Sequence, residues 1–147
     1  MKTALTKDPQ LSSRFHASSA GIFAYPGDRA SSHSREVMLS DWKIDISGHA
    51  ASALNEKAVF EAFLILTMTL SQKESILSEY PEAIGKTYAL KEFIENGQSR
   101  TYYSRDNLRS LDISDPYGKA LPIYSRCAIE IKEAVDKLTE RLLQFGI

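Results

Sequence analysis

The chain has 147 residues, enough for one domain with a buried core, and its 43% apolar and 25% charged residues are ordinary for a soluble globular protein. Eighteen basic and nineteen acidic side chains give a formal net charge of −1, and no basic stripe or zinc-finger spacing indicates nucleic-acid binding. The longest apolar run, 62–68, is too short to cross a bilayer, and the N-terminus has no signal-peptide core. We therefore expect a single domain over 1–147, located in the cytoplasm, with no membrane or nucleic-acid partner.

The first part of the chain predicts helices separated by one strand and a turn-rich loop. Residues 1–13 have a helical pattern that Asp8-Pro9 interrupts, and 15–22 read as a strand that runs into a loop. A helix is expected over 32–42, with Ser31 or Ser32 as its N-cap. Its apolar face is formed by Val37, Met38 and Trp42.

The middle of the chain predicts a buried strand followed by a helix. Asn55 is placed to cap a helical turn that leads into a continuous apolar strand over 62–69. Ser71 and Glu74 have the spacing of a capping box, in which each side chain bonds a free amide near the other residue. This pair predicts a helix that begins at Ser71 and runs to about Tyr80.

The last part predicts a second strand and a long surface helix. Residues 87–90 are predicted to form a buried strand, a short helix is expected to follow and end near Gly97, and 98–114 are polar and irregular. From Leu121 to the end, apolar residues recur at helical spacing, namely Cys127, Ile131, Ala134, Val135, Leu138 and Leu142. Strands that alternate with helices indicate an α/β domain with a small, mostly parallel sheet.

One acidic residue stands out as a candidate for chemistry. Pro116 fixes its own φ and holds the preceding Asp115 in an extended conformation, beside the aromatic Tyr117. A positioned carboxylic acid can protonate a leaving oxygen, although Asp-Pro is also a common turn dipeptide. Taken alone, the pair favours the turn over catalysis.

Other chemistry-bearing residues do not form a recognisable site. Cys127 lies on the apolar stripe of the last helix and is expected to be a buried core residue, and Glu133, not arginine, stands six positions after it. The three histidines, His16, His33 and His49, are far apart, so we expect no metal site and no cofactor. No glycine-rich phosphate loop of the nucleotide-binding types is present.

Several segments together resemble the low-molecular-weight protein-tyrosine phosphatase family, in the bacterial branch that includes protein arginine phosphatases. They are SSAGIFAYPGDRAS (18–31), DISGHAA (45–51), LILTMTLSQKESIL (64–77), TYALKEF (87–93) and SDPYGKALPIYSRCAIEI (114–131). The resemblance covers nearly the whole chain in collinear order. It implies a three-layer αβα fold with a parallel sheet of strand order 2-1-3-4.

The resemblance also assigns roles to particular residues. In this family a cysteine thiolate attacks phosphorus, an arginine and backbone amides hold the phosphate, and an aspartate protonates the leaving group. Asp115 matches that general acid, and Tyr117 matches the aromatic that flanks the substrate. Ser19 and His49 match the polar pair that supports the phosphate loop. Lys43 stands where relatives often have glycine, which would cost about 1 kcal/mol if its backbone is left-handed.

The same comparison identifies a departure from the family. The first strand, the Cys-x5-Arg loop and the start of the first helix precede Ser-Ala-Gly in the family, whereas residues 1–5 here correspond to the middle of that helix. We therefore expect a domain shortened at its N-terminus that does not turn over phosphate as given. Removing one strand leaves about 9.6 Å between the segments 15–20 and 62–69. We expect marginal stability, collapse of these two segments onto each other, or a strand from another chain, including self-association through the gap.

Three functions remain open. The first is an enzyme that hydrolyses phosphotyrosine on a protein, or a small phosphomonoester, once the missing loop is supplied. The second is a catalytically inactive binding module or a decaying pseudophosphatase. Activity on phosphoarginine, or arsenate reduction, is less favoured, the latter because it requires more cysteines than the single Cys127.

Overall fold

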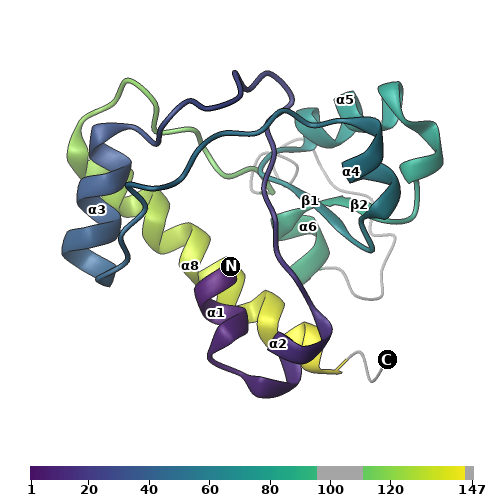
Figure 1. Ribbon diagram of the computed structural model, residues 1–147, viewed down its shortest axis with the longest axis horizontal. Coiled ribbons are helices and arrows are strands. Elements are labelled where there is room, and N and C mark those ends of the chain that lie inside the picture. Colours follow the sequence, from purple (N-terminus) through teal and green to yellow (C-terminus); the bar gives the residue numbers. More distant parts are fainter. Residues whose placement is uncertain (96–110, 145–147) are drawn as a thin grey trace.

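The computed structural model describes residues 1–95 and 111–144, and all statements below concern these residues. Their elements in chain order are α1 (Lys2–Thr6), α2 (Pro9–Arg14), α3 (Ser32–Trp42), α4 (Glu56–Glu61), β1 (Ile65–Thr67), α5 (Leu70–Glu79), the 3-10 helix η1 (Pro81–Ala83), β2 (Thr87–Ala89), α6 (Leu90–Glu95) and α8 (Leu121–Gln144) (Figure 1). The expected end of a helix near Gly97 and most of the irregular 98–114 segment fall outside the described residues.

The sheet consists of β1 and β2, which run parallel. Ile65 pairs with Thr87, Leu66 with Tyr88 and Thr67 with Ala89. Helix α5 connects the two strands and contacts both of them, and α6 contacts both strands and α8. This arrangement confirms the α/β class with a small parallel sheet.

Helix α8 joins the two sides of the molecule. In Figure 1 it crosses the structure diagonally, with α3, α1 and α2 along one side and the sheet with α6 on the other. Its buried face packs into a core that draws on α1, α2, the start of α6 and the segment before α8. The core members are Leu5, Leu11, Leu90, Ile113, Cys127, Ala134, Leu138 and Leu142. The expected stripe of α8 is therefore confirmed as its buried face.

Side chains cap three helix starts in the first half of the chain, and the caps of α3 and α4 were expected. The Asp8 carboxylate accepts from the Gln10 amide at 2.8 Å and begins α2. The Ser31 hydroxyl accepts from the Ser34 amide at 3.2 Å, and the Asn55 side chain accepts from the Ala58 amide at 2.9 Å. Each cap satisfies an amide that has no partner inside its own helix.

The predicted start of α5 at Ser71 is wrong. Thr69 is the N-cap, and its hydroxyl accepts from the Gln72 amide at 3.2 Å. The Gln72 side chain in turn accepts from the amide of Met68, the residue before the N-cap, at 3.0 Å, so a variant of the capping box is present two residues earlier than expected. The helix ends at Glu79, close to the expected end.

The predicted strand over 15–22 is also not formed. Residues 15–20 have no assigned secondary structure, and in 15–22 only Gly21 makes a bridge, an isolated parallel one to Ala53. Collapse of 15–20 onto 62–69 was one of three outcomes considered. Among the described residues no backbone hydrogen bond joins these two segments, although the Phe15 and Phe63 ring centroids lie 6.4 Å apart. A strand forms only where a neighbouring strand pairs with it. β1 is therefore limited to the three residues Ile65–Thr67, which pair with β2.

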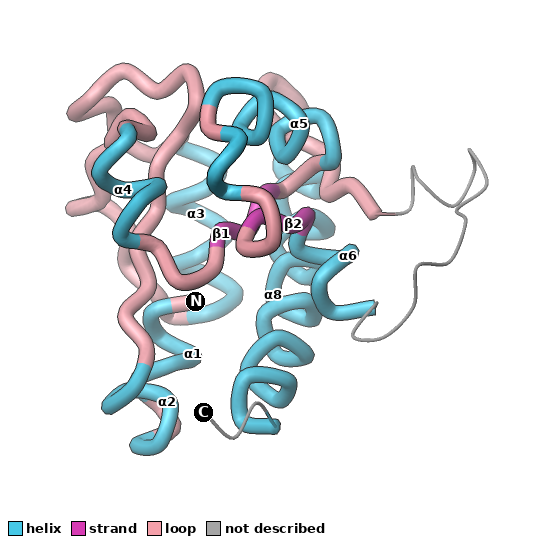
Figure 2. The backbone as a smooth tube through the Cα atoms, turned by 90° about the vertical axis from the view of Figure 1, so that its right-hand side faces the viewer, coloured by secondary structure: helices cyan, strands magenta, loops and turns pink. Residues whose placement is uncertain are grey.

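The two ends of the described chain lie near each other in space. In Figure 2, α1 and α2 lie beside the carboxyl-terminal part of α8, and both helices contact it. Within 1–95 and 111–144, no helix combines the length and apolar character needed to cross a membrane.

Candidate active site

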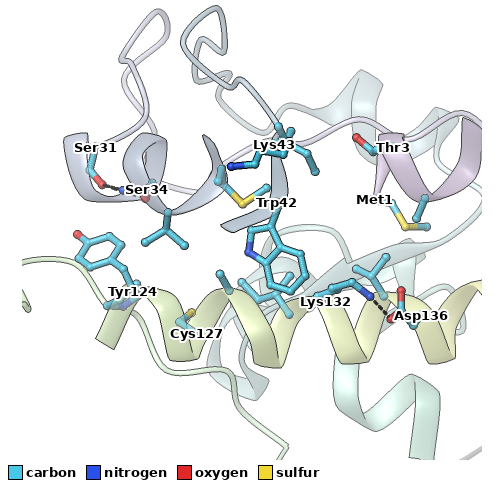
Figure 3. Close-up of a pocket in the computed structure, with 18 of the residues that line it drawn as sticks. Met1, Thr3, Ser31, Ser34, Trp42, Lys43, Tyr124, Cys127, Lys132 and Asp136 are labelled. Carbon is cyan, nitrogen blue, oxygen red and sulfur yellow. Dashed lines mark hydrogen bonds and ion pairs between the residues drawn. The ribbon is translucent and has the colours of Figure 1, made fainter. Parts of the chain in front are cut away.

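A large groove lies over α8, between α3 on one side and α1 on the other (Figure 3). Its volume is about 1180 Å³. Apolar side chains from the three helices line much of it, among them Ala4, Val37, Met38, Trp42, Ile131 and Val135. Asp28, Arg29 and the Asp115–Tyr117 turn also line it. The groove therefore joins an apolar trough to a polar rim that carries the predicted acid.

Asp115 is placed in this rim with its carboxylate available. Its Oδ1 accepts a hydrogen bond from the Tyr117 amide at 2.9 Å, which closes a short turn through Pro116. The residue is exposed, and the Tyr117 side chain beside it is 77% exposed. Asp115 and Tyr117 thus lie together at the groove, and the turn holds the acid without removing it from solvent.

Ser19 and His49 do not line the groove. Both are exposed, and within the described residues neither side chain makes a hydrogen bond. Their loops are joined by backbone bonds: the Gly21 amide donates to Ser52 O at 2.9 Å, and the Ala51 amide donates to Asp28 O at 2.8 Å. Their supporting role stays a prediction.

Cys127 lies at the groove but is not prepared for nucleophilic attack. Its side chain is buried, and its Sγ lies 3.5 Å from the Ser114 carbonyl oxygen, to which the thiol donates. Burial raises the pKa of this thiol above its ordinary value, and the nearby Glu130 and Asp115 carboxylates raise it further. A raised pKa keeps the sulfur protonated, as expected for a core cysteine.

Sequence reasoning missed residues that only long-range packing brings to this region. The Asp112 carboxylate accepts from the Leu70 amide at 2.7 Å, across 42 positions, and so links the segment before the acid turn to the start of α5. Arg29 is a second charged group at the rim. No local signal marks either residue, because neither belongs to a helix cap or motif readable along the chain.

No metal centre is indicated in the part of the chain that the structure describes. There, no group of three or more His, Cys, Asp or Glu side chains is clustered in a way that could hold an ion. The groups available for chemistry at the rim of the groove include the carboxylates of Asp28 and Asp115, the Arg29 guanidinium and the Tyr117 ring.

Known proteins are similar to this chain in sequence and in fold. A protein-arginine-phosphatase of Geobacillus stearothermophilus is 32% identical over 142 residues, covering 97% of this chain and 86% of its own length. A probable low molecular weight protein-tyrosine-phosphatase, EpsP, of Ralstonia nicotianae is 34% identical over 128 residues, covering 87% and 77%. The relatives thus include one named as a phosphatase of protein arginine and one named as a probable phosphatase of protein tyrosine.

Solved structures agree with the sequence comparisons. The low molecular weight protein tyrosine phosphatase from T. tengcongensis superposes with a TM-score of 0.78 at 36% identity, over 95% of this chain and 86% of that one. The YwlE arginine phosphatase from G. stearothermophilus gives 0.73 at 31% identity, over 86% and 73%. The sequence model for low molecular weight phosphotyrosine protein phosphatases matches residues 1–144. The chain belongs to the low molecular weight phosphotyrosine protein phosphatase family.

Proposed function

We propose that this chain carries the acid half of a phosphatase active site for a phosphorylated protein or a small phosphomonoester. Asp115 is the general acid and Tyr117 flanks the substrate. The observation that supports this best is their shared position at the rim of the groove, with the Asp115 carboxylate exposed and held by the Tyr117 amide. Ser19 and His49 support the phosphate loop in the same proposal.

The chemistry assigned to Asp115 is a single proton transfer. As a nucleophile forms its bond to phosphorus, the bond from phosphorus to the leaving oxygen breaks and that oxygen gains an electron pair. The carboxylic acid gives its proton to this oxygen and becomes a carboxylate. A Cys-x5-Arg loop would supply the nucleophile and the phosphate cradle, because a helix N-terminus and an arginine lower a thiol pKa and bind the dianion.

The chain alone is expected to be inactive. Its sequence contains no Cys-x5-Arg, and its one thiol is buried with a raised pKa. Purified protein should hydrolyse p-nitrophenyl phosphate no faster than buffer. Asp115→Asn and Cys127→Ser variants, purified in parallel, are the matched controls. Turnover that either substitution abolishes would contradict the proposal of inactivity.

The nucleotides upstream of the Met1 codon show whether a longer product would contain the Cys-x5-Arg loop that the catalytic proposal requires. An in-frame Cys-x5-Arg there makes the longer product an enzyme, and that product should lose most of its turnover on Asp115→Asn. An in-frame stop codon directly upstream favours the alternative of a pseudophosphatase or binding module.

The proposed substrate class is phosphotyrosine, because Tyr117 offers an exposed aromatic surface at the groove and the 21–27 loop is uncharged. The named relatives also bring phosphoarginine into consideration. An active, longer product assayed on one peptide phosphorylated at tyrosine and one at arginine separates the two. Faster hydrolysis of the phosphoarginine peptide would overturn the proposed substrate.

A further inference from the structure

The segment 112–114, which leads into Asp115, starts from a fixed point at the edge of the sheet. In Figure 1 this green segment leaves the sheet and runs toward the start of α8. The Ile113 amide donates to Met68 O at 2.8 Å, directly after β1, and the Ile113 side chain is buried in the core. The segment therefore begins at the carboxyl end of β1, the edge of a parallel sheet at which ligand sites form.

The Asp112 carboxylate ties the same segment to α5. It accepts from the Leu70 amide at 2.7 Å. Leu70 is the first residue of α5, so its amide has no carbonyl partner within the helix, and a carboxylate there also meets the positive end of the helix dipole. One side chain thus satisfies the start of α5 and holds the backbone three residues before the proposed acid.

Two further side chains hold the backbone of this segment. The Lys91 ammonium donates to the Asp112 carbonyl oxygen at 3.2 Å and is paired with the Glu130 carboxylate of α8. The Cys127 thiol donates to the Ser114 carbonyl oxygen at 3.5 Å. These contacts add α6 and α8 to the elements that hold the segment.

The turn that follows is bonded only to itself. The Tyr117 amide donates to Asp115 Oδ1 and the Lys119 amide donates to Pro116 O, both at 2.9 Å. Within the described residues, no hydrogen bond joins 115–119 to another element. The position of the Asp115 carboxylate relative to the sheet is therefore set through the segment before the turn.

We propose that Asp112 is a positioning residue for the general acid: its bond to the Leu70 amide fixes the Asp115 turn relative to the carboxyl end of β1. The inference rests on the proposed role of Asp115 and adds a residue that acts only through it. Without the Asp112 acceptor, the Leu70 amide loses its partner and the segment loses its tie to α5. The turn should then open locally, together with the contact between Ser114 and Cys127.

The Cys127 thiol reports on the turn in the chain as it is. It is the only thiol, so iodoacetamide labels one site, and Figure 3 shows it on α8 at the groove. Burial raises the pKa of this thiol, and the Glu130 and Asp115 carboxylates raise it further. A turn that moves away uncovers the thiol and also lowers its pKa toward the ordinary value. The pH profile of the alkylation rate therefore depends on where the turn lies.

Three variants separate positioning from general support of the fold. Asp112→Ala removes the acceptor, whereas Asp112→Asn keeps an oxygen that can accept from the Leu70 amide. Asn55→Ala is the matched control, because it removes the acceptor of the Ala58 amide at the start of α4. We expect alkylation about tenfold faster than in the parent for Asp112→Ala, with its pH midpoint lowered, and a parent-like midpoint for the other two.

Urea distinguishes local opening from global unfolding. Each alkylation rate is measured at several urea concentrations below the unfolding transition. Local opening of the turn exposes little surface, so the fast rate of Asp112→Ala should hardly depend on urea. A rate that rises steeply with urea would mean that Asp112 only supports the whole fold, and it would overturn the proposal.

Three other results would also overturn the proposal. They are a parent-like rate and pH midpoint in Asp112→Ala, the same changes in Asn55→Ala, or failure of Asp112→Asn to keep the parent profile. Should circular dichroism show that Asp112→Ala does not fold, Asp112→Glu decides instead. It moves the carboxylate by one methylene and should still lower the midpoint, and a parent-like profile there would overturn the proposal.

A kinetic measurement extends the test to any longer, active product. There Asp112→Ala should lower kcat about tenfold with KM unchanged, and Asp112→Asn should restore it, because a misplaced acid affects the chemical step and not binding. A rise in KM alone would contradict the positioning role. The alkylation readouts involve no phosphate chemistry, so they decide on Asp112 whatever the turnover assay shows for the proposed function.

Discussion

Cys127 illustrates how one buried atom sets both reactivity and stability. Its thiol is in the core formed by α1, α2, α6 and α8, and burial raises its pKa. The sulfur is therefore held in its neutral form near neutral pH, where a thiolate is needed for attack on phosphorus or on an alkylating agent. The position of the side chain thus accounts for the expected inertness of the only thiol.

A pH dependence of stability follows from the raised pKa. The unfolded chain loses the Cys127 proton near the ordinary value of about 9, while the folded chain still holds it. The free energy of unfolding should therefore fall as pH rises from about 9 toward the raised value. Urea unfolding of the parent and Cys127→Ala at a series of alkaline pH values tests this. Parallel pH slopes for the two proteins would show that the thiol is not shifted.

Lys43 is a second residue whose conformation has a measurable cost. It follows α3 with φ 56 and ψ 32, in the left-handed region, and is the one described non-glycine residue with positive φ. Lys43→Gly should stabilise the protein by about 1 kcal/mol, because glycine adopts this conformation without a Cβ clash. Thermal unfolding measures the gain. Lys43→Ala, which removes the same side chain but keeps a Cβ, should show no such gain.

At the scale of elements, α4 depends on a lysine distant in sequence. The Lys86 ammonium donates to the carbonyl oxygens of Val59, Phe60 and Ala62 at 2.8, 3.1 and 2.9 Å. These carbonyls lie at the carboxyl end of α4, where a positive charge also meets the negative end of the helix dipole. Lys86 thereby ties α4 to the start of β2.

Lys86→Met should therefore destabilise the protein by about 1–3 kcal/mol, because partly buried carbonyls lose a charged donor. The control is Lys57→Met, which removes an exposed lysine of α4 itself. Lys57 lies 3.8 Å from Glu61 with its side chain 80% exposed, so its loss should cost less than about 1 kcal/mol. Urea unfolding compares the two, and equal effects would refute the capping role of Lys86.

The elements show what the sequence can and cannot predict. Caps that lie within a few residues of their helix, such as Ser31 and Asn55, were predicted correctly because their signal is local. The α5 start was misplaced because Thr69 and Ser71 offer the same hydroxyl, and Leu70 is fixed by the distant Asp112. The 15–22 strand failed for a related reason, since apolar content does not supply a pairing neighbour.

At the scale of the molecule, the groove itself could not be predicted, although both residues proposed for its rim could. Asp115 and Tyr117 were identified through the resemblance of their segment to the family, and their positions relative to each other are set by one turn. The groove depends on how α1 and α3 pack along α8. More than a hundred residues separate α1 from α8 along the chain. The periodicity of apolar residues within one helix does not predict which distant helix it packs against.

Hydrogen exchange should distinguish the hydrogen-bonded amides around β1 from the unbonded amides of the 16–20 segment. The Ile65 amide donates to Lys86 O at 2.7 Å, and the Ile113 amide donates to Met68 O at 2.8 Å, so both should exchange slowly. Within the described residues, the amides of 16–20 make no backbone bond and should exchange quickly. The protein is first shown to be a monomer by sedimentation. Strong protection of 16–20 in that monomer would mean that the segment has found a strand partner.

Helix α8 has a consequence for how the protein is made. Its 24 residues span about 36 Å, and it is the surface on which α1, α2, α3 and α6 all pack. Because α8 follows α1, α2, α3 and α6 along the chain, these helices leave the ribosome before the surface on which they pack has been made. Their apolar faces therefore stay accessible to proteases and chaperones until α8 has emerged from the ribosome.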